Sequence, residues 1–212
     1  YSASKGMAEV AIRNYVESFF NKPNSNVRLG IARAGNVIGG GDWAIDRIVP
    51  DCMQAWSSGR VVDIRSPQAT RPWQHVLEPL SGYLTLADSL AQSDVKHGEA
   101  YNFGPSADVN YPVSELINEM SKFWDQVQWR DVSTSKNHFH EAGLLKLNCD
   151  KVLFDLNWKP TLRFEETVKM TVEWYKNYYQ NHECSMFDLT ISQIDQYTKL
   201  AKSRGITWEN ND

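Results

Sequence analysis

The chain has 212 residues, of which 42% are hydrophobic and 23% are charged, and its formal net charge is −4 at pH 7. This composition is typical of a folded protein with one large domain or two small ones, and it argues against disorder. The charges show no basic excess, which argues against a nucleic-acid-binding protein. No apolar run is long enough to cross a membrane and no signal peptide is visible, so no membrane partner is expected. Because the chain begins with Tyr1, we expect a fragment or a processed chain.

Residues 1–20 carry apolar side chains at helical spacing and are expected to form an amphipathic helix. Tyr1 and Lys5, four residues apart, would share one face of that helix. A nearby positive charge favours the phenolate and lowers the pKa of a phenol from its usual value of about 10. Such a pair is suited to take a proton from a sugar or alcohol hydroxyl. The same spacing also occurs by chance on surface helices, so the pair alone does not establish an enzyme.

The rest of the chain alternates between strands and helices. In chain order we expect a turn at 21–26, a strand over 27–32 that leads into 33–38, a glycine-rich loop at 39–43, a helix over 46–59, a strand over 61–64, a helix over 76–92, a strand over 100–104, a helix over 113–124 starting at Pro112, a strand over 127–132, and helices over 149–156 and 163–180. The tail, 182–212, is polar and is expected to be partly helical. This alternation predicts an α/β chain.

The cysteines and histidines give no metal motif. Cys52, Cys149 and Cys184 form neither a disulfide framework nor a Cys-x-x-Cys pair, so we expect reduced thiols in a cytoplasmic protein. His138 and His140 lack the i, i+4 helical spacing of zinc sites, so no metal is expected.

The order of motifs resembles one family, the extended short-chain dehydrogenase/reductases that act on nucleotide sugars. Tyr1-x-x-x-Lys5 resembles its catalytic pair, and the run RAGNV from Arg33 resembles the strand end that follows. The later NFG at 102–104, the Asp150-Lys151 pair and the LNWKP run at 156–160 are similar to its C-terminal signature, with Asn157 replacing the usual glycine. Three further runs resemble the CDP-glucose 4,6-dehydratases of this family: GGGDWAIDRIVPD at 39–51, RPWQHVLEPL at 71–80 and HFHEA at 138–142.

The resemblance implies the C-terminal part of a Rossmann-type, doubly wound parallel sheet with a smaller α/β substrate-binding domain. The remainder of the NAD-binding domain would comprise 1–38 and part of 61–105. The substrate domain would comprise 39–60 and 106–180, followed by the tail 181–212. The phosphate loop, the catalytic Ser/Thr and the dehydration acid and base of the family would lie upstream of Tyr1. We therefore expect residues 1–212 alone neither to hold NAD well nor to catalyse the reaction.

The implied activity is that of a lyase, the NAD-dependent dehydration of CDP-glucose to CDP-4-keto-6-deoxyglucose in deoxysugar and O-antigen biosynthesis. Tyr1 would take the C4 hydroxyl proton, and Lys5 would lower the phenol pKa and bind the nicotinamide ribose. Hydride would pass to NAD, water would leave across C5–C6, and hydride would return to C6. The expected cofactor-binding residues are Tyr1, Lys5 and Arg33.

The residues expected to bind the nucleotide sugar are Asn36, Gly41, Asp42, Trp43, Arg47, Arg71, His140 and Glu141. Asn36 ends a strand where α/β folds place ligands, and guanidinium groups such as that of Arg71 match phosphate geometry. Arg65 is a second phosphate candidate and His75 only a possible site residue. Each has a structural alternative. The glycines suit a phosphate cradle or a flexible turn, Trp43 suits the base or the core, and Arg47 suits the ligand or a surface ion pair.

Helix 1–20 has a second apolar face, with Val10, Tyr15 and Phe19, which in relatives pairs with its copy, so we expect a homodimer. The alternative is packing within the chain. Two other functions stay open. One is a different nucleotide-sugar epimerase or dehydratase of the same family, and the other is a non-catalytic nucleotide-sugar-binding domain.

Overall fold

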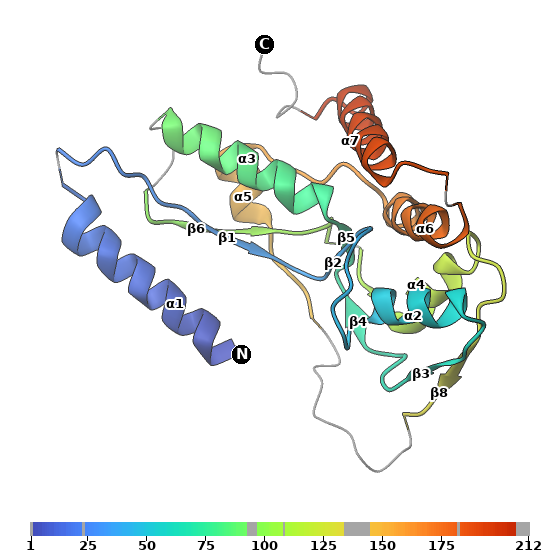
Figure 1. Ribbon diagram of the computed structural model, residues 1–212. Coiled ribbons are helices and arrows are strands. Elements are labelled where there is room, and N and C mark those ends of the chain that lie inside the picture. The colour runs from blue at the N-terminus through green and yellow to red at the C-terminus, as the bar shows by residue number, and fades with distance from the viewer. Residues whose placement is uncertain are drawn as a thin grey trace.

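The computed structural model describes residues 2–22, 24–92, 97–107, 109–133, 145–181 and 183–206. Helices and short strands alternate along this part of the chain (Figure 1). The helices are α1 (Ser2–Tyr15), α2 (Ile48–Ser57), α3 (Leu77–Ala91), α4 (Val113–Met120), α5 (Asp150–Leu156), α6 (Phe164–Gln180) and α7 (Met186–Ser203), and a π-helical turn, η1 (Val16–Phe20), continues α1. The expected α/β class is confirmed.

The strands form pairs that are mostly parallel. They are β1 (Ile31–Ala34), β2 (Val37–Ile38), β3 (Val62–Ile64), β4 (Thr70–Arg71), β5 (Gln74–His75), β6 (Ala100–Phe103), β7 (Tyr111–Pro112) and β8 (Trp129–Asp131). Strands β1 and β6, β2 and β5, and β3 and β8 pair in parallel, whereas β4 and β7 are antiparallel. Among the described residues, β1 pairs with β6 alone.

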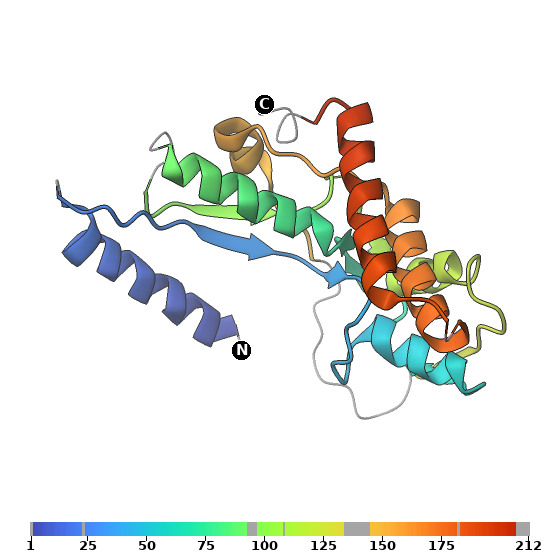
Figure 2. The ribbon, with the colours of Figure 1, turned by 45° about the horizontal axis from the view of Figure 1, so that its top comes forward.

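The β1–β6 pair separates two helices. Helix α3 lies on one face of the pair and α1 on the other, with the N-terminal end of α1 toward the carboxyl end of β1 (Figures 1 and 2). On the α3 side, Phe103 of β6 makes an edge-to-face contact with Trp158 at 5.1 Å between ring centroids. Leu86 of α3 and Val152 of α5 are buried in the same cluster. Aromatic and aliphatic burial of this kind holds α3 and α5 on the sheet.

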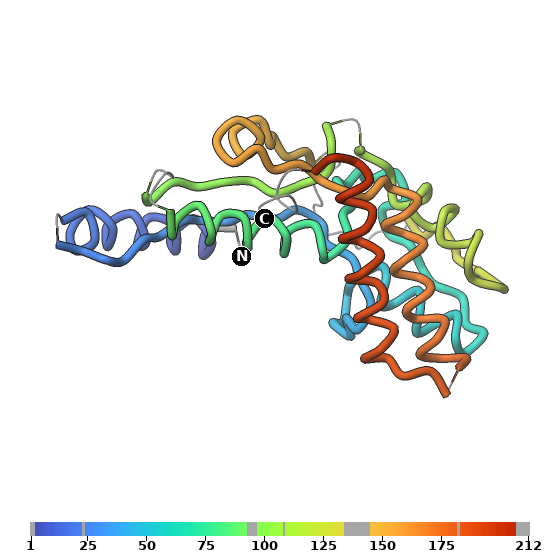
Figure 3. The backbone as a smooth tube through the Cα atoms, turned by 90° about the horizontal axis from the view of Figure 1, so that it is seen from above, coloured from blue at the N-terminus to red at the C-terminus, as the bar shows by residue number. Residues whose placement is uncertain are grey.

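The second part of the fold is a larger core built by α2, α4 and α6. Met53, Leu116, Ile117 and Val168 are fully buried there, together with Tyr175. Helix α7 lies alongside α6 (Figures 2 and 3). Apolar residues that recur every three or four positions give α4 and α6 the buried faces that the sequence predicts.

Several element boundaries differ from expectation; α4, for example, ends at Met120 rather than at residue 124. Regular α-helix ends at Tyr15 rather than at residue 20, and the chain continues as a π-helical turn. The strand expected over 27–32 begins only at Ile31, where backbone pairing with β6 begins. The tail is partly helical, as expected, and its helix α7 buries Gln193, Tyr197 and Ala201.

Candidate functional site

The N-terminal helix is fixed against the end of β1 by an ion pair. Glu9 of α1 accepts hydrogen bonds from Arg33 of β1 at 2.6 Å from Nε and 2.5 Å from Nη2. Lys5 lies one helical turn before Glu9, on the same face and toward the carboxyl end of β1. The structure thus places Lys5 on the side of the sheet where α/β folds bind ligands. Tyr1 lies outside the described residues.

A cavity of about 650 Å³ opens where β1 and β2 end. It brings together three residues that the sequence predicts as ligand contacts, namely Asn36, Asp42 and Arg47. Its remaining walls come from the same strand ends, the glycine-rich loop and the start of α2: Ala34, Gly35, Val37, Ile38, Gly39, Gly40, Ala44, Ile48, Val49, Pro50, Trp73, Val76 and Leu145. A single hollow therefore collects polar groups from separate elements, as binding sites do.

The glycine-rich loop is held against α6 rather than free. A methyl group on Gly40 would overlap the Trp174 ring, and Gly41 has a φ of +78°, which suits glycine. The buried Tyr175 hydroxyl donates to the Asp42 carbonyl at 2.7 Å and accepts the Asp42 N–H at 3.1 Å. These contacts exclude a loose turn at 40–42 and give the cavity a fixed wall.

Trp43 stands at the edge of this wall, and its side chain remains 49% exposed. Its ring centroid lies 4.8 Å from that of Tyr178 and 5.5 Å from that of Tyr175. Tyr178 in turn stacks on Trp174 at 5.7 Å with an interplanar angle of 10°. The loop therefore ends in a half-exposed aromatic cluster, so neither alternative for Trp43, core or ligand surface, is eliminated.

The start of α2 supplies positive potential to the cavity. Arg47 is the N-cap residue of α2, and Ile48, Val49 and Pro50 of the first turn also line the cavity. The first N–H groups of a helix are not used within it and favour bound anions. Burial raises the pKa of Asp51 in this turn, and the nearby Asp46 adds to the rise.

Two other predicted residues lie in the neighbouring strands. Arg71 of β4 is buried and donates from Nη1 to the Thr70 carbonyl at 2.8 Å, and it is not among the described residues that line the cavity. His75 of β5 is buried, which lowers its pKa to about 4, and its Nδ1 accepts the Leu77 N–H at 3.3 Å. His75 is thus a neutral buried histidine, as the structural alternative expects. Arg65 lies 3.8 Å from Asp46 in an exposed ion pair.

Two residues of this region have structural roles that the sequence analysis does not predict. Tyr175, which anchors the Asp42 backbone, resembles any apolar residue of an amphipathic helix, and Glu78 resembles an exposed helical glutamate. Glu78 is in fact 1% exposed and accepts hydrogen bonds from Thr161, Leu162 and Tyr197. These donors lie 83, 84 and 119 positions later in the chain. Only the tertiary fold brings these partners together.

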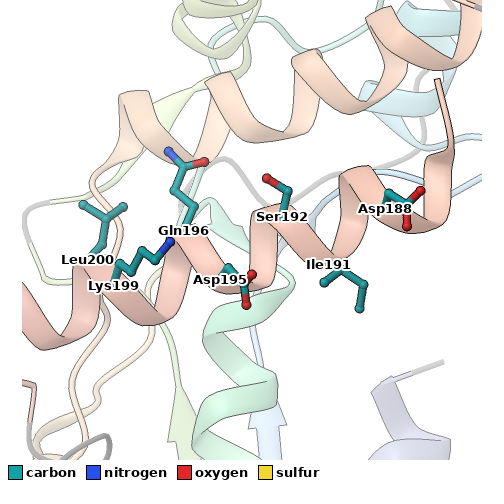
Figure 4. Close-up of a pocket in the computed structure, with 7 residues that line it drawn as sticks. All are labelled: Asp188, Ile191, Ser192, Asp195, Gln196, Lys199 and Leu200. Atoms are coloured by element: carbon teal, nitrogen blue, oxygen red, sulfur yellow. The ribbon is translucent and has the colours of Figure 1, made fainter.

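His140 and Glu141 lie outside the described residues, and their predicted ligand roles stay predictions. Within the described ranges, the histidines, cysteines and acidic residues form no group of three that could hold a metal ion. No helix in the same ranges is both long and apolar enough to cross a membrane. The three cysteines are free thiols. A further hollow is lined by seven residues of α7 alone (Figure 4) and collects none of the predicted site residues.

Comparisons with known proteins agree on one family of folds. The dTDP-glucose 4,6-dehydratase of Bacillus anthracis in complex with NAD superposes with a TM-score of 0.63 at 19% identity, covering 86% of this chain and 53% of that one. The UDP-glucose 4-epimerase of Thermotoga maritima with UDP-glucose gives 0.66 at 18% identity, covering 85% of this chain and 54% of that one. These matches establish a shared fold. No protein-family model matches the chain.

Curated sequences give a more specific relationship. The dTDP-D-glucose 4,6-dehydratase of Mus musculus is 24% identical over 187 residues, covering 85% of this chain and 48% of that protein. The CDP-glucose 4,6-dehydratase of Salmonella typhimurium is 43% identical over 180 residues, covering 83% of this chain and 50% of that protein. The chain is therefore a homologue of CDP-glucose 4,6-dehydratase that spans about half the length of the curated relatives it matches.

Proposed function

We propose that this chain is the substrate-binding portion of an NAD-dependent CDP-glucose 4,6-dehydratase, a hydro-lyase. The observation that carries the proposal is the convergence of Asn36, Asp42 and Arg47 on one cavity at the ends of parallel strands. The 43% identity to the Salmonella enzyme supports CDP-glucose as the ligand. The net reaction is loss of water from CDP-glucose to give CDP-4-keto-6-deoxyglucose, a step of deoxysugar biosynthesis.

The cavity offers a distinct group to each part of such a ligand. The diphosphate would lie at the start of α2, where Arg47 and unused N–H groups favour negative charge. The Asn36 amide is suited to donate to a sugar or phosphate oxygen. The half-exposed Trp43 ring, supported by Tyr178, gives the base or ribose an aromatic surface. Asp42 also lines the cavity, whereas Gly41, Arg71, His140 and Glu141 remain predicted contacts.

Lys5 and Tyr1 would carry the proton chemistry. The ion pair between Glu9 and Arg33 supports this role, because it directs the Lys5 end of α1 toward the carboxyl end of β1. There the Lys5 ammonium would favour the phenolate of Tyr1, which takes the proton of the C4 hydroxyl.

The described residues fit the cofactor only in part. Lys5 suits a ribose hydroxyl of NAD, whereas the Arg33 guanidinium is engaged by Glu9 and lies 3.4 Å from Asn102 Oδ1. The chemistry that NAD supplies when bound is reversible hydride transfer. Among the described residues β1 pairs with β6 alone, so its other edge is suited to further strands of a doubly wound sheet. We propose that such strands complete the cofactor site in the active enzyme.

The active enzyme would be a homodimer through α1. Met7 and Val10 are 72% and 69% exposed, and Tyr15 and Phe19 are also exposed, so this apolar face does not pack within the described part of the chain. An uncovered apolar helix face of this size is typical of an interface.

Incubation of the complete enzyme with NAD and CDP-, dTDP- or GDP-glucose tests the function. We expect a 4-ketosugar, detected by its ultraviolet absorbance in base, from CDP-glucose in preference to the other two. Product from GDP-glucose or dTDP-glucose alone would indicate another family member. Binding without product would indicate a non-catalytic nucleotide-sugar-binding domain.

A further inference from the structure

A buried carboxylate that does not itself line the cavity joins three helices. Glu78 lies in the first turn of α3 and accepts the Thr161 N–H at 3.0 Å on each oxygen and the Leu162 N–H at 2.6 Å. Its Oε2 also accepts the hydroxyl of Tyr197, a residue of α7 that is itself buried, at 2.8 Å. Thr161 and Leu162 immediately precede α6. We call Glu78, Ser81, Thr161, Leu162 and Tyr197 the Glu78 network.

The hydroxyl groups of the network are joined to one another as well as to Glu78. Tyr197 Oη lies 2.8 Å from Glu78 Oε2 and 3.0 Å from Ser81 Oγ. Ser81 Oγ donates to the Glu78 carbonyl at 2.8 Å and accepts the Trp158 indole N–H at 3.0 Å. The network is therefore a specific polar arrangement and not only packing.

Helix α7 and the residue that follows it contact α6 at three points between Glu166 and Trp174. Gln193 donates to the Met170 carbonyl at 2.7 Å, and Thr190 accepts the Trp174 indole N–H at 3.0 Å. At the other end, Arg204 donates to both oxygens of Glu166 at 2.6 and 2.8 Å. Thr190 and Gln193 lie on one face of α7, and Arg204 is its C-cap residue, so the first two thirds of α6 are held by α7 and its C-cap.

The position of helix α6 determines where two of its residues contact the cavity wall. Tyr175 binds both backbone groups of Asp42, and Trp174 fills the space beside Gly40. Tyr175 lies 11 residues after Phe164, a rise of about 16 Å along the helix. A shift at the start of α6 would therefore move Trp174 and Tyr175 against the 40–42 loop, since a packed helix moves as a unit.

We propose that Tyr197 is a positioning residue for the cavity: through Glu78 it fixes the start of α6, and α6 in turn fixes the Gly40–Asp42 wall. Helix α7, which contributes no residue to the described lining of the cavity, thereby shapes the site. The consequence for ligand binding rests on the proposed function, whereas the consequence for the loop does not.

The test is the Tyr197→Phe variant of the 212-residue chain, followed by hydrogen exchange at the Asp42 amide, the donor to Tyr175. Because a net hydrogen bond changes an equilibrium about fivefold, we expect exchange at Asp42 to be about fivefold faster, as well as at residues 161–162. The Tyr83→Phe variant is the matched control, since it removes a phenol hydroxyl from α3 outside the network. It should leave exchange at Asp42 unchanged.

Two further measurements keep the outcome decisive. Thr190→Val removes the acceptor of the Trp174 indole and should speed exchange at Asp42 in the same direction, even if Tyr197→Phe fails to fold. Faster exchange at 161–162 with wild-type exchange at Asp42 would overturn the proposal, as would an unchanged Thr190→Val variant. CDP-glucose should bind Tyr197→Phe about fivefold more weakly. If the wild-type chain does not bind CDP-glucose, the proposed function fails and exchange still decides the positioning role.

Discussion

The guanidinium of Arg33 donates two hydrogen bonds to the carboxylate of Glu9, at 2.6 and 2.5 Å. This contact joins the N-terminal helix to the carboxyl end of strand β1, next to the cavity. The paired charges raise the pKa of Arg33 and lower the pKa of Glu9, chiefly through the hydrogen bond between them. Because Lys5 lies one turn before Glu9, the same contact orients the predicted catalytic end of α1.

Replacing Glu9 by glutamine should loosen α1. The pair is partly exposed, so we expect a loss of about 0.5–1 kcal/mol in the free energy of unfolding and faster proteolysis within α1. Since folding lowers the pKa of Glu9, its contribution is present above the ordinary value of 4.5 and is lost as the pH falls through the folded-state value. Urea unfolding of the wild type and the variant at pH 7 and pH 3.5 measures this contribution to the free energy of unfolding. The Glu17→Gln variant, about two turns further along the chain in η1, is the control, and an equal effect there would contradict the role of the pair.

A methyl group at Gly40 should disturb the cavity wall. It would overlap the Trp174 ring, and overpacking of this kind costs about 1–3 kcal/mol. We expect Gly40→Ala to lower the midpoint of urea unfolding and to weaken CDP-glucose binding. Gly6→Ala is the matched control, because Gly6 lies inside α1 with open space around it, so alanine there should stabilise the helix by up to about 1 kcal/mol. Equal midpoints for the two variants would count against the packed loop.

The stability of the chain should depend on pH through Glu78. Burial raises its pKa to about 7, while hydrogen bonds from Leu162, Thr161 and Tyr197 and the charge of Arg204 lower it. Folding thus raises the pKa of this acid, so the folded state binds more protons between about pH 4.5 and 7, and stability falls as the pH rises through that window. From the two pKa values the change is on the order of 3 kcal/mol.

The Glu78→Gln variant isolates this contribution. Its free energy of unfolding, measured in urea at pH 5, 6, 7 and 8, should have a flatter pH profile than the wild type, whatever its absolute value. Parallel profiles would show that Glu78 keeps an ordinary pKa in the folded chain.

The exposed face of α1 should mediate self-association. A charge at Val10 would be buried in the proposed dimer, so Val10→Glu should convert a dimer into a monomer in sedimentation equilibrium with unchanged circular dichroism. Leu84→Glu is the control, because Leu84 is 73% exposed on α3, outside that face. A wild-type chain that is strictly monomeric would refute the dimer.

The sequence predicted those features that depend on local pattern. Helical spacing identified α1, α3 and α6, and the strand-end position of Asn36 and the GGGDW run identified residues that do share a cavity with Arg47. The two-residue strands β4 and β5 could not be predicted, because so short a segment has no period of its own and depends on its partner strand.

Long-range polar contacts could not be predicted from the sequence either. Glu78 occupies a position that suits solvent in an isolated helix, and its burial follows from the approach of Thr161 and Tyr197 much later in the chain. Tyr175 fits the apolar stripe of α6, but its function in the wall is decided by the Asp42 backbone. Neither contact leaves a pattern in the sequence.

Titration calorimetry of the 212-residue chain with CDP-glucose tests the central claim most directly. We expect saturable one-to-one binding that Arg47→Ala weakens by at least about tenfold, since a charge-assisted hydrogen bond to phosphate contributes about 1.5–3 kcal/mol. Arg60→Ala, which removes an exposed arginine just beyond the other end of α2, should bind like the wild type. Binding of equal strength in the Arg47→Ala and wild-type chains, or no binding of CDP-glucose to either, would contradict the account.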